Sequence, residues 1–71
     1  MLREFSVVVE RDEDGFYVAS VPALPGCHTQ ARSLDTLMER IREAIALHME
    51  DRTDDLPALE FIGVQRVTVA A

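Results

Sequence analysis

The stretch from Asp12 to Cys27 constrains the fold of this chain more than any other. It holds an acidic turn that ends in Gly15, a short apolar run, and two prolines close together before Gly26. Glycine tolerates positive φ, whereas proline removes a backbone donor and keeps the residue before it extended. The stretch therefore predicts a hairpin turn, a strand, and a stiff connection that ends in a tight reversal.

Two strands flank the acidic turn. Residues 3–10 alternate in polarity, with Phe5, Val7 and Val9 on one side, which is the period of a half-buried strand. Residues 16–21 are again aromatic and β-branched, so the two runs predict a hairpin. Residues 27–31 predict a short third strand. Together with Gly15 of the turn, the connection before it supplies the residues that we expect to act as a structural motif: Pro22, Leu24, Pro25, Gly26 and Cys27.

An amphipathic helix follows. Ser33 suits the N-cap of a helix that begins at Leu34, and Asp35 in the first turn complements the helix dipole. Thr36 at the N3 position leaves the capping box incomplete. One stripe then recurs every three or four residues over about four turns. Its members are Leu34, Leu37, Met38, Ile41, Ala44, Ile45, His48 and Met49.

The remaining residues complete an α+β pattern. Residues 51–57 are acidic and contain a proline, which predicts a loop, and residues 61–69 return to strand composition. The element order is then β-β-β-α-β. A right-handed crossover through the helix places the last strand parallel to the first. We therefore expect residues 1–71 to form a single domain, with a four-stranded mixed sheet in the order 3-2-1-4 and one helix on one face.

Length and composition narrow the classes of function. A chain of 71 residues buries only about 60% of the surface that its unfolded form exposes, so we expect a homo-oligomer or a partner to cover the open sheet face. No stretch resembles a signal peptide or a membrane span, and the single cysteine favours a reducing, cytoplasmic location. The net charge of −6 disfavours nucleic-acid binding and favours a basic protein partner.

The acidic turn invites a metal-binding interpretation. Glu10, Asp12 and Asp14 before Gly15 match the first half of a calcium loop, but Val21 stands where the closing carboxylate belongs. A solvated hairpin turn is therefore the preferred interpretation. A two-metal nuclease would need a second acidic group beside the first, and the expected topology separates the two by about 20 Å. That second group is Glu50, Asp51, Asp54 and Asp55.

Cys27 and His28 stand next to each other, which suggests a nucleophile and its base. Neighbouring side chains on a strand point to opposite faces, so they are not expected to form a dyad. Cys27 is better explained as a small buried residue, and His48 as a boundary residue of the helix stripe. We assign no catalytic, cofactor-binding or metal site, and we expect no enzymatic activity.

Two motifs stand at a fixed separation in the first half of the chain. They are Asp14-Gly15-Phe16-Tyr17-Val18-Ala19 and Val21-Pro22-Ala23-Leu24-Pro25-Gly26-Cys27. Together with Thr29-Gln30 and the helical Arg42-Glu43-Ala44-Ile45, they make the chain similar to the HicB-type antitoxin domain over nearly its whole length.

This resemblance implies a β-β-β-α-β domain of partial ribonuclease H-like shape that lacks that enzyme's activity. Members of the family act in type II toxin-antitoxin pairs. The domain covers a small basic toxin of the HicA type, an mRNA-cleaving ribonuclease, and blocks its catalytic histidine. Typical members also carry a C-terminal DNA-binding segment. This chain ends at Ala71, just after the last expected strand, so it resembles the short stand-alone form and we expect no direct DNA binding from it.

Three hypotheses for function follow. The first is an antitoxin module that binds a HicA-type toxin. The second is a stand-alone oligomeric binding or accessory domain without a toxin partner, and the third, the least supported, is a metal-dependent nuclease. For the first, we expect the acidic rim and its neighbourhood to bind the partner. The candidate partner-binding residues are Glu10, Asp12, Glu13, Asp14 and Tyr17.

Overall fold

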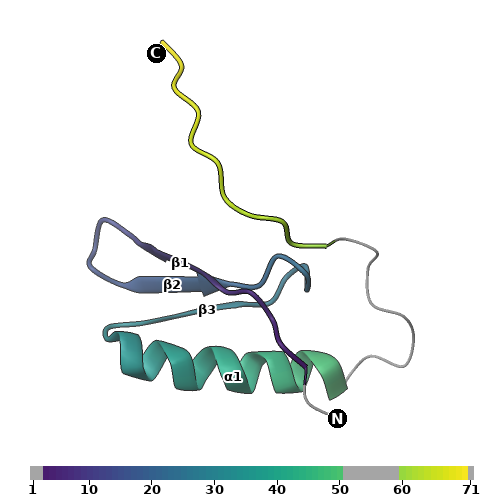
Figure 1. Cartoon of the computed structure of the whole chain (residues 1–71). Coiled ribbons are helices and arrows are strands. Elements are labelled where there is room, and N and C mark those ends of the chain that lie inside the picture. The colour runs from purple at the N-terminus through teal and green to yellow at the C-terminus, as the bar shows by residue number, and fades with distance from the viewer. Residues whose placement is uncertain (1–2, 51–59, 71) are drawn as a thin grey trace.

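A computed structural model describes residues 3–50 and 60–70. Three strands precede one helix: β1 (Val8–Arg11), β2 (Tyr17–Ser20), β3 (His28–Ala31) and α1 (Leu34–Glu50). The strands form an antiparallel sheet in the order β1-β2-β3, and α1 lies along one of its faces (Figure 1). The prediction of an α+β fold with three strands followed by a helix is confirmed.

The ladder of the sheet is shorter than the strand patterns in the sequence. Val8 pairs with Ser20, and Ser20 pairs with His28, so all three strands begin or end at this level. Beyond it, Pro22 lacks the N–H that a ladder needs. The sequence predicted a first strand from residue 3, but residues 3–7 lie outside the ladder. β2 ends at Ser20, and beyond it the Val21 N–H already donates to the Cys27 carbonyl.

The connection between β2 and β3 forms a compact loop around one leucine. The N–H of Val21 donates to the Cys27 carbonyl at 3.0 Å, and the N–H of Cys27 donates to the Leu24 carbonyl at 2.9 Å. Leu24 is fully buried, and Gly26 takes a φ of 86°, which favours glycine. The loop satisfies its own backbone groups while it inserts Leu24 into the core.

Ser33 begins α1 as the sequence predicted. The Thr36 N–H donates to the Ser33 Oγ at 3.2 Å, and the Leu37 N–H donates to the Ser33 carbonyl at 3.0 Å. Leu37 and Ile41 are the buried residues of the helix. Arg40 also donates from Nη1 to the Gln30 carbonyl at 2.8 Å, which ties the helix to β3.

The core lies between the sheet and α1. The helix packs against β3 and β2 but does not contact the four residues of β1. Ala19, which lies at the centre of the sheet and pairs with Val9 and Thr29, is completely buried. The buried core consists of Ala19, Val21, Leu24, Cys27, Ala31, Leu37 and Ile41.

Residues 60–70, called the C-terminal segment below, form neither helix nor strand, and all of them are exposed. Ile62, Val64, Val67 and Val69 are 72–86% exposed, and the chain runs away from the sheet (Figure 1). The expected fourth strand at residues 61–69, the order 3-2-1-4 and the ribonuclease H-like arrangement are therefore not confirmed. Strand composition indicates that a segment suits a sheet, but it does not indicate which edge the segment joins.

Candidate functional site

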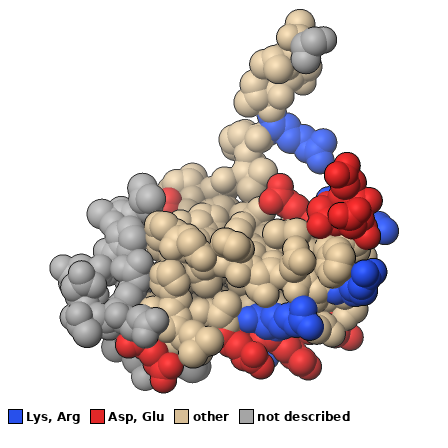
Figure 2. Space-filling model, turned by 180° about the vertical axis from the view of Figure 1, so that it is seen from behind, with Lys and Arg blue, Asp and Glu red and all other residues tan. Residues whose placement is uncertain are grey.

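The β1–β2 turn is built around Asp12. Its Oδ1 accepts hydrogen bonds from the Asp14 N–H at 3.0 Å and the Phe16 N–H at 2.9 Å. Its backbone N–H donates to the Phe16 carbonyl at 2.9 Å, and Gly15 takes a φ of 87°. Asp12 thus stabilises the turn, while Glu13 and Asp14 are exposed on its outside. The turn lies at the left of Figure 1 and so at the right of Figure 2, where acidic side chains gather.

The same geometry bears on the metal-binding interpretation. The Asp12 oxygen that would bind a cation already accepts two backbone N–H groups. Within residues 3–50 and 60–70, no three His, Cys, Asp or Glu side chains come together as metal ligands would. Asp51, Asp54 and Asp55 lie outside the described residues. The turn has the hydrogen bonds of a structural Asx turn.

The candidate partner-binding residues do not share one face. Glu10 pairs with Val18 on the sheet face away from α1, whereas Tyr17 is half-buried and packs against the core on the helix side. The Arg11 guanidinium carbon lies 5.7 Å from the centroid of the Tyr17 ring, which places a cation over this aromatic group. The exposed candidates Glu10, Glu13 and Asp14 remain a predicted binding surface, and Tyr17 stands apart from them.

The helix-free face of the sheet combines apolar and polar side chains. Val8, Val18 and Ser20 are half-buried, while Glu10 and His28 are exposed. At one end of this face the Arg32 guanidinium carbon lies 4.4 Å from the centroid of the Phe16 ring. The sequence predicted that a partner covers this open face, but it did not predict the cation–π pair.

Cys27 and His28 do not form a dyad. Cys27 belongs to the core, and burial raises the pKa of its thiol above the ordinary value. His28 is exposed, and it pairs with Ser20 of the neighbouring strand β2. A buried, protonated thiol is a poor nucleophile, so this pair has no catalytic geometry.

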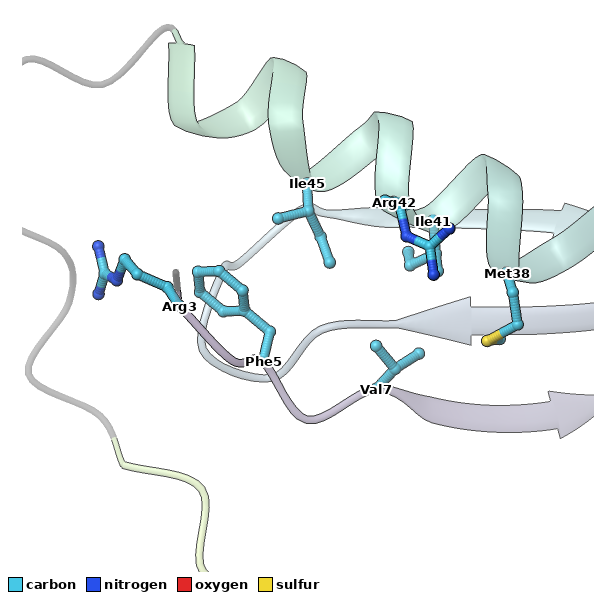
Figure 3. A pocket seen from close by; sticks show the side chains of 7 residues that line it. All are labelled: Arg3, Phe5, Val7, Met38, Ile41, Arg42 and Ile45. Carbon is cyan, nitrogen blue, oxygen red and sulfur yellow. The ribbon is translucent and has the colours of Figure 1, made fainter. Parts of the chain in front are cut away.

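A groove of about 310 Å³ runs between the N-terminal residues and α1 (Figure 3). Phe5 and Val7 line one side, and Met38, Ile41 and Ile45 line the other. Two arginines complete the lining. They are Arg3, whose guanidinium carbon lies 5.5 Å from the centroid of the Phe5 ring, and Arg42.

Sequence reasoning did not predict this groove. Its signals in the sequence are Phe5 and Val7 on one side of the first apolar run and a helix stripe that includes Met38 and Ile45.

The helix α1 is too short and too polar to span a membrane, and the described part of the chain holds no other candidate span. The described residues form an α+β structure with an acidic turn, an apolar groove and an exposed C-terminal segment.

Residues 5–66 match the family model described as a HicB-like antitoxin of bacterial toxin-antitoxin systems. A UPF0150 protein of Archaeoglobus fulgidus is 59% identical over 66 residues, which cover 93% of this chain and 94% of the relative. UPF0150 proteins of Synechocystis sp. and Thermoplasma acidophilum are 46% and 35% identical, and the matches cover 94% and 96% of this chain and 96% and 99% of those relatives.

Proposed function

Because the chain belongs to the HicB-like antitoxin family, we propose that it acts in a type II toxin-antitoxin pair and neutralises a small basic toxin of the HicA type. The family match over residues 5–66 carries this proposal. The net charge of −6 supports it, since a strongly acidic domain attracts a basic partner. Neutralisation by covering a toxin needs no catalytic group in this chain.

The toxin would meet the exposed carboxylates first. Glu13 and Asp14 lie outside the turn, and Glu10 continues the acidic surface onto the helix-free face. Complementary charge accelerates encounter, while apolar contacts hold the complex once it has formed. Val8 and Val18 supply half-buried apolar surface beside Glu10. Asp12 would contribute indirectly, because its carboxylate holds the turn that presents its neighbours.

The same proposal includes the complete sheet. Residues 61–69 would add a fourth strand beside β1, which gives the order 3-2-1-4 and a partial ribonuclease H-like arrangement. A homo-oligomer in the cytoplasm would be the working form. The strand composition of the segment and the exposure of Val64, Val67 and Val69 support this addition.

A stand-alone oligomeric binding or accessory domain is the second candidate function. The observation that favours it is the apolar surface on both the groove and the C-terminal segment, which suits self-association without any toxin. The antitoxin function requires a basic protein that this chain neutralises, whereas the stand-alone function requires none.

Co-expression distinguishes them. A small basic protein encoded beside this chain should arrest growth alone, and the chain should rescue growth and co-purify with it. Replacement of Glu13 and Asp14 by Lys should slow association about tenfold at low salt. A matched control replaces Glu39 and Glu43, exposed acidic residues on α1, by Lys. If the chain neither rescues growth from a neighbouring basic protein nor binds one, the antitoxin function is wrong for this chain.

A further inference from the structure

Two apolar surfaces of this molecule have no cover among the described residues: the groove between residues 3–7 and α1, which lies just before β1, and the C-terminal segment. We propose that the C-terminal segment of a second copy of this chain pairs with the free edge of β1 and fills the groove, so that two copies exchange segments. This inference rests on the proposed fourth strand and is independent of toxin binding. It specifies which molecule supplies that strand.

The free edge of β1 is suited to receive a strand. β1 pairs with β2 along one edge, and within the described residues no strand pairs with its other edge. A free edge presents unpaired N–H and C=O groups to any extended chain. The added strand would lie about 4.8 Å away, so its inward side chains would enter the space between β1 and α1. Phe5, Val7 and Ile45 already form apolar walls there.

The C-terminal segment has the matching properties. Residues 61–69 and residues 3–11 are runs of equal length, so one can lie along the whole of the other at about 3.3 Å per residue. Val67 and Val69 fall on one face of such a strand, while Arg66 falls on the other. Both valines are at least 72% exposed, so pairing would remove apolar surface from water.

The course of the chain favours a second copy over the same copy. Phe61 and Glu60 line a pocket together with Pro22 and Ala23, so the start of the segment lies beside the β2–β3 loop. From there the segment leaves on the side of the sheet opposite α1 (Figure 1), whereas the groove lies on the α1 side (Figure 3). A two-fold arrangement would make the same contact twice and give each groove a segment.

Local charge permits this contact in an acidic protein. The groove lining contains Arg3 and Arg42 and no carboxylate. The segment carries Glu60 and Arg66, which balance each other. The acidic turn follows the opposite end of β1, so like charges would stay outside the interface.

The test uses the full chain and measures its mass by light scattering over a range of concentrations. The wild type should be a dimer. The tail variant, Val67→Asn with Val69→Asn, and the groove variant, Met38→Glu, should each raise the dissociation constant at least about tenfold. Leu47→Asn is the matched control, because Leu47 is an exposed apolar residue that lines no part of the groove, and it should leave the constant unchanged.

Mixing the two variants tests exchange itself. The groove variant keeps an intact segment and the tail variant keeps an intact groove, so the mixed dimer has one contact free of substitutions, which both variant dimers lack. Where either substitution alone abolishes a contact, the mixed dimer should be at least about tenfold tighter than either variant dimer. Native mass spectrometry would identify that species. If both variants dimerised as tightly as the wild type, exchange would be refuted.

Amide hydrogen exchange covers the remaining outcomes. Protection of residues 61–69 should rise with protein concentration. A wild-type monomer would overturn the inference, and protection of the segment in that monomer would show that it pairs with its own β1. If Met38→Glu does not fold, the tail variant still decides, since its substitutions replace exposed side chains. Loss of toxin rescue alongside intact dimer exchange would remove the antitoxin function and leave this inference standing.

Discussion

The helix-covered sheet and the C-terminal segment contain similar residues but differ in how far those residues are buried. Val21 is 2% exposed beneath the β2–β3 loop, whereas Val69 is 72% exposed in the segment. Both belong to short β-branched runs. The difference is that Val21 has a second layer, supplied by α1 and Leu24, while the segment has no layer against which to pack. Apolar composition alone does not bury a residue, because burial requires a second surface.

Substitution of a buried helix residue should destabilise the protein more than substitution of an exposed residue in the C-terminal segment. Leu37→Ala removes a fully buried side chain and should lower the free energy of unfolding by about 2–5 kcal/mol, a large part of the stability of a small domain. Ile62→Ala, at an 86% exposed position of the segment, should change it by less than about 0.5 kcal/mol in dilute solution. Urea denaturation followed by circular dichroism measures both. Equal effects would show that the two regions do not differ.

A second comparison uses glycines. Gly26→Ala should cost about 1–2 kcal/mol, since a side chain at φ 86° is strained even where space is open. Gly63→Ala should cost nothing measurable, because Gly63 has no positive φ and a Cβ there would meet nothing within 4 Å. The same denaturation experiment applies. A cost at Gly63 comparable to that at Gly26 would place the segment in a constrained conformation.

Substitutions in the β1–β2 turn test whether the hydrogen bonds of Asp12 contribute to stability. Asp12→Ala removes two hydrogen bonds to backbone N–H groups and should cost about 1 kcal/mol. Glu13→Ala is the neighbouring control with the same loss of charge, and it should stay within about 0.5 kcal/mol. A larger effect at Glu13 than at Asp12 would contradict the turn geometry.

The smallest expected effect on stability is the pH dependence that arises from the thiol of Cys27. Burial raises the pKa of Cys27, so the folded state holds this proton more tightly than the unfolded state. The resulting stability is fully present below the ordinary pKa of the thiol in the unfolded chain, and it is lost as the pH rises through the higher folded value. Denaturation midpoints between pH 7 and pH 10 would show this decline, and it should vanish in Cys27→Ala.

The reactivity of a thiol should also differ between the core and the C-terminal segment. The comparison is with a thiol introduced into the C-terminal segment by Val64→Cys, in a chain that also carries Cys27→Ala. At pH 8 the thiol of native Cys27 should react with an aromatic disulfide reagent at least about tenfold more slowly than the introduced thiol. Equal rates would show that the core opens as readily as the segment is exposed.

The sequence predicted the local features well because neighbouring residues determine them. Ser33 caps α1, Gly15 and Gly26 take positive φ, and the helix period places Leu37 in the core. These outcomes depend on hydrogen bonds and contacts within a few residues, or on one face of an element.

The position of the C-terminal segment and the shape of the groove could not be predicted in the same way. The pairing of residues 61–69 depends on which free edge they meet, and a period of two is the same for every edge. The groove depends on how far α1 lies from β1, which no single helix pattern contains. Tyr17 lies near the acidic turn in the sequence, and the pleat turns its side chain toward the core.

The hydrogen bond from Arg40 to the Gln30 carbonyl has a consequence for assembly. It occupies a backbone acceptor of β3, the strand at the opposite edge of the sheet from β1. A sheet that can grow at two edges can polymerise without limit, whereas one that grows at a single edge closes once that edge is satisfied. One arginine on the helix thus favours a finite complex over an open-ended filament.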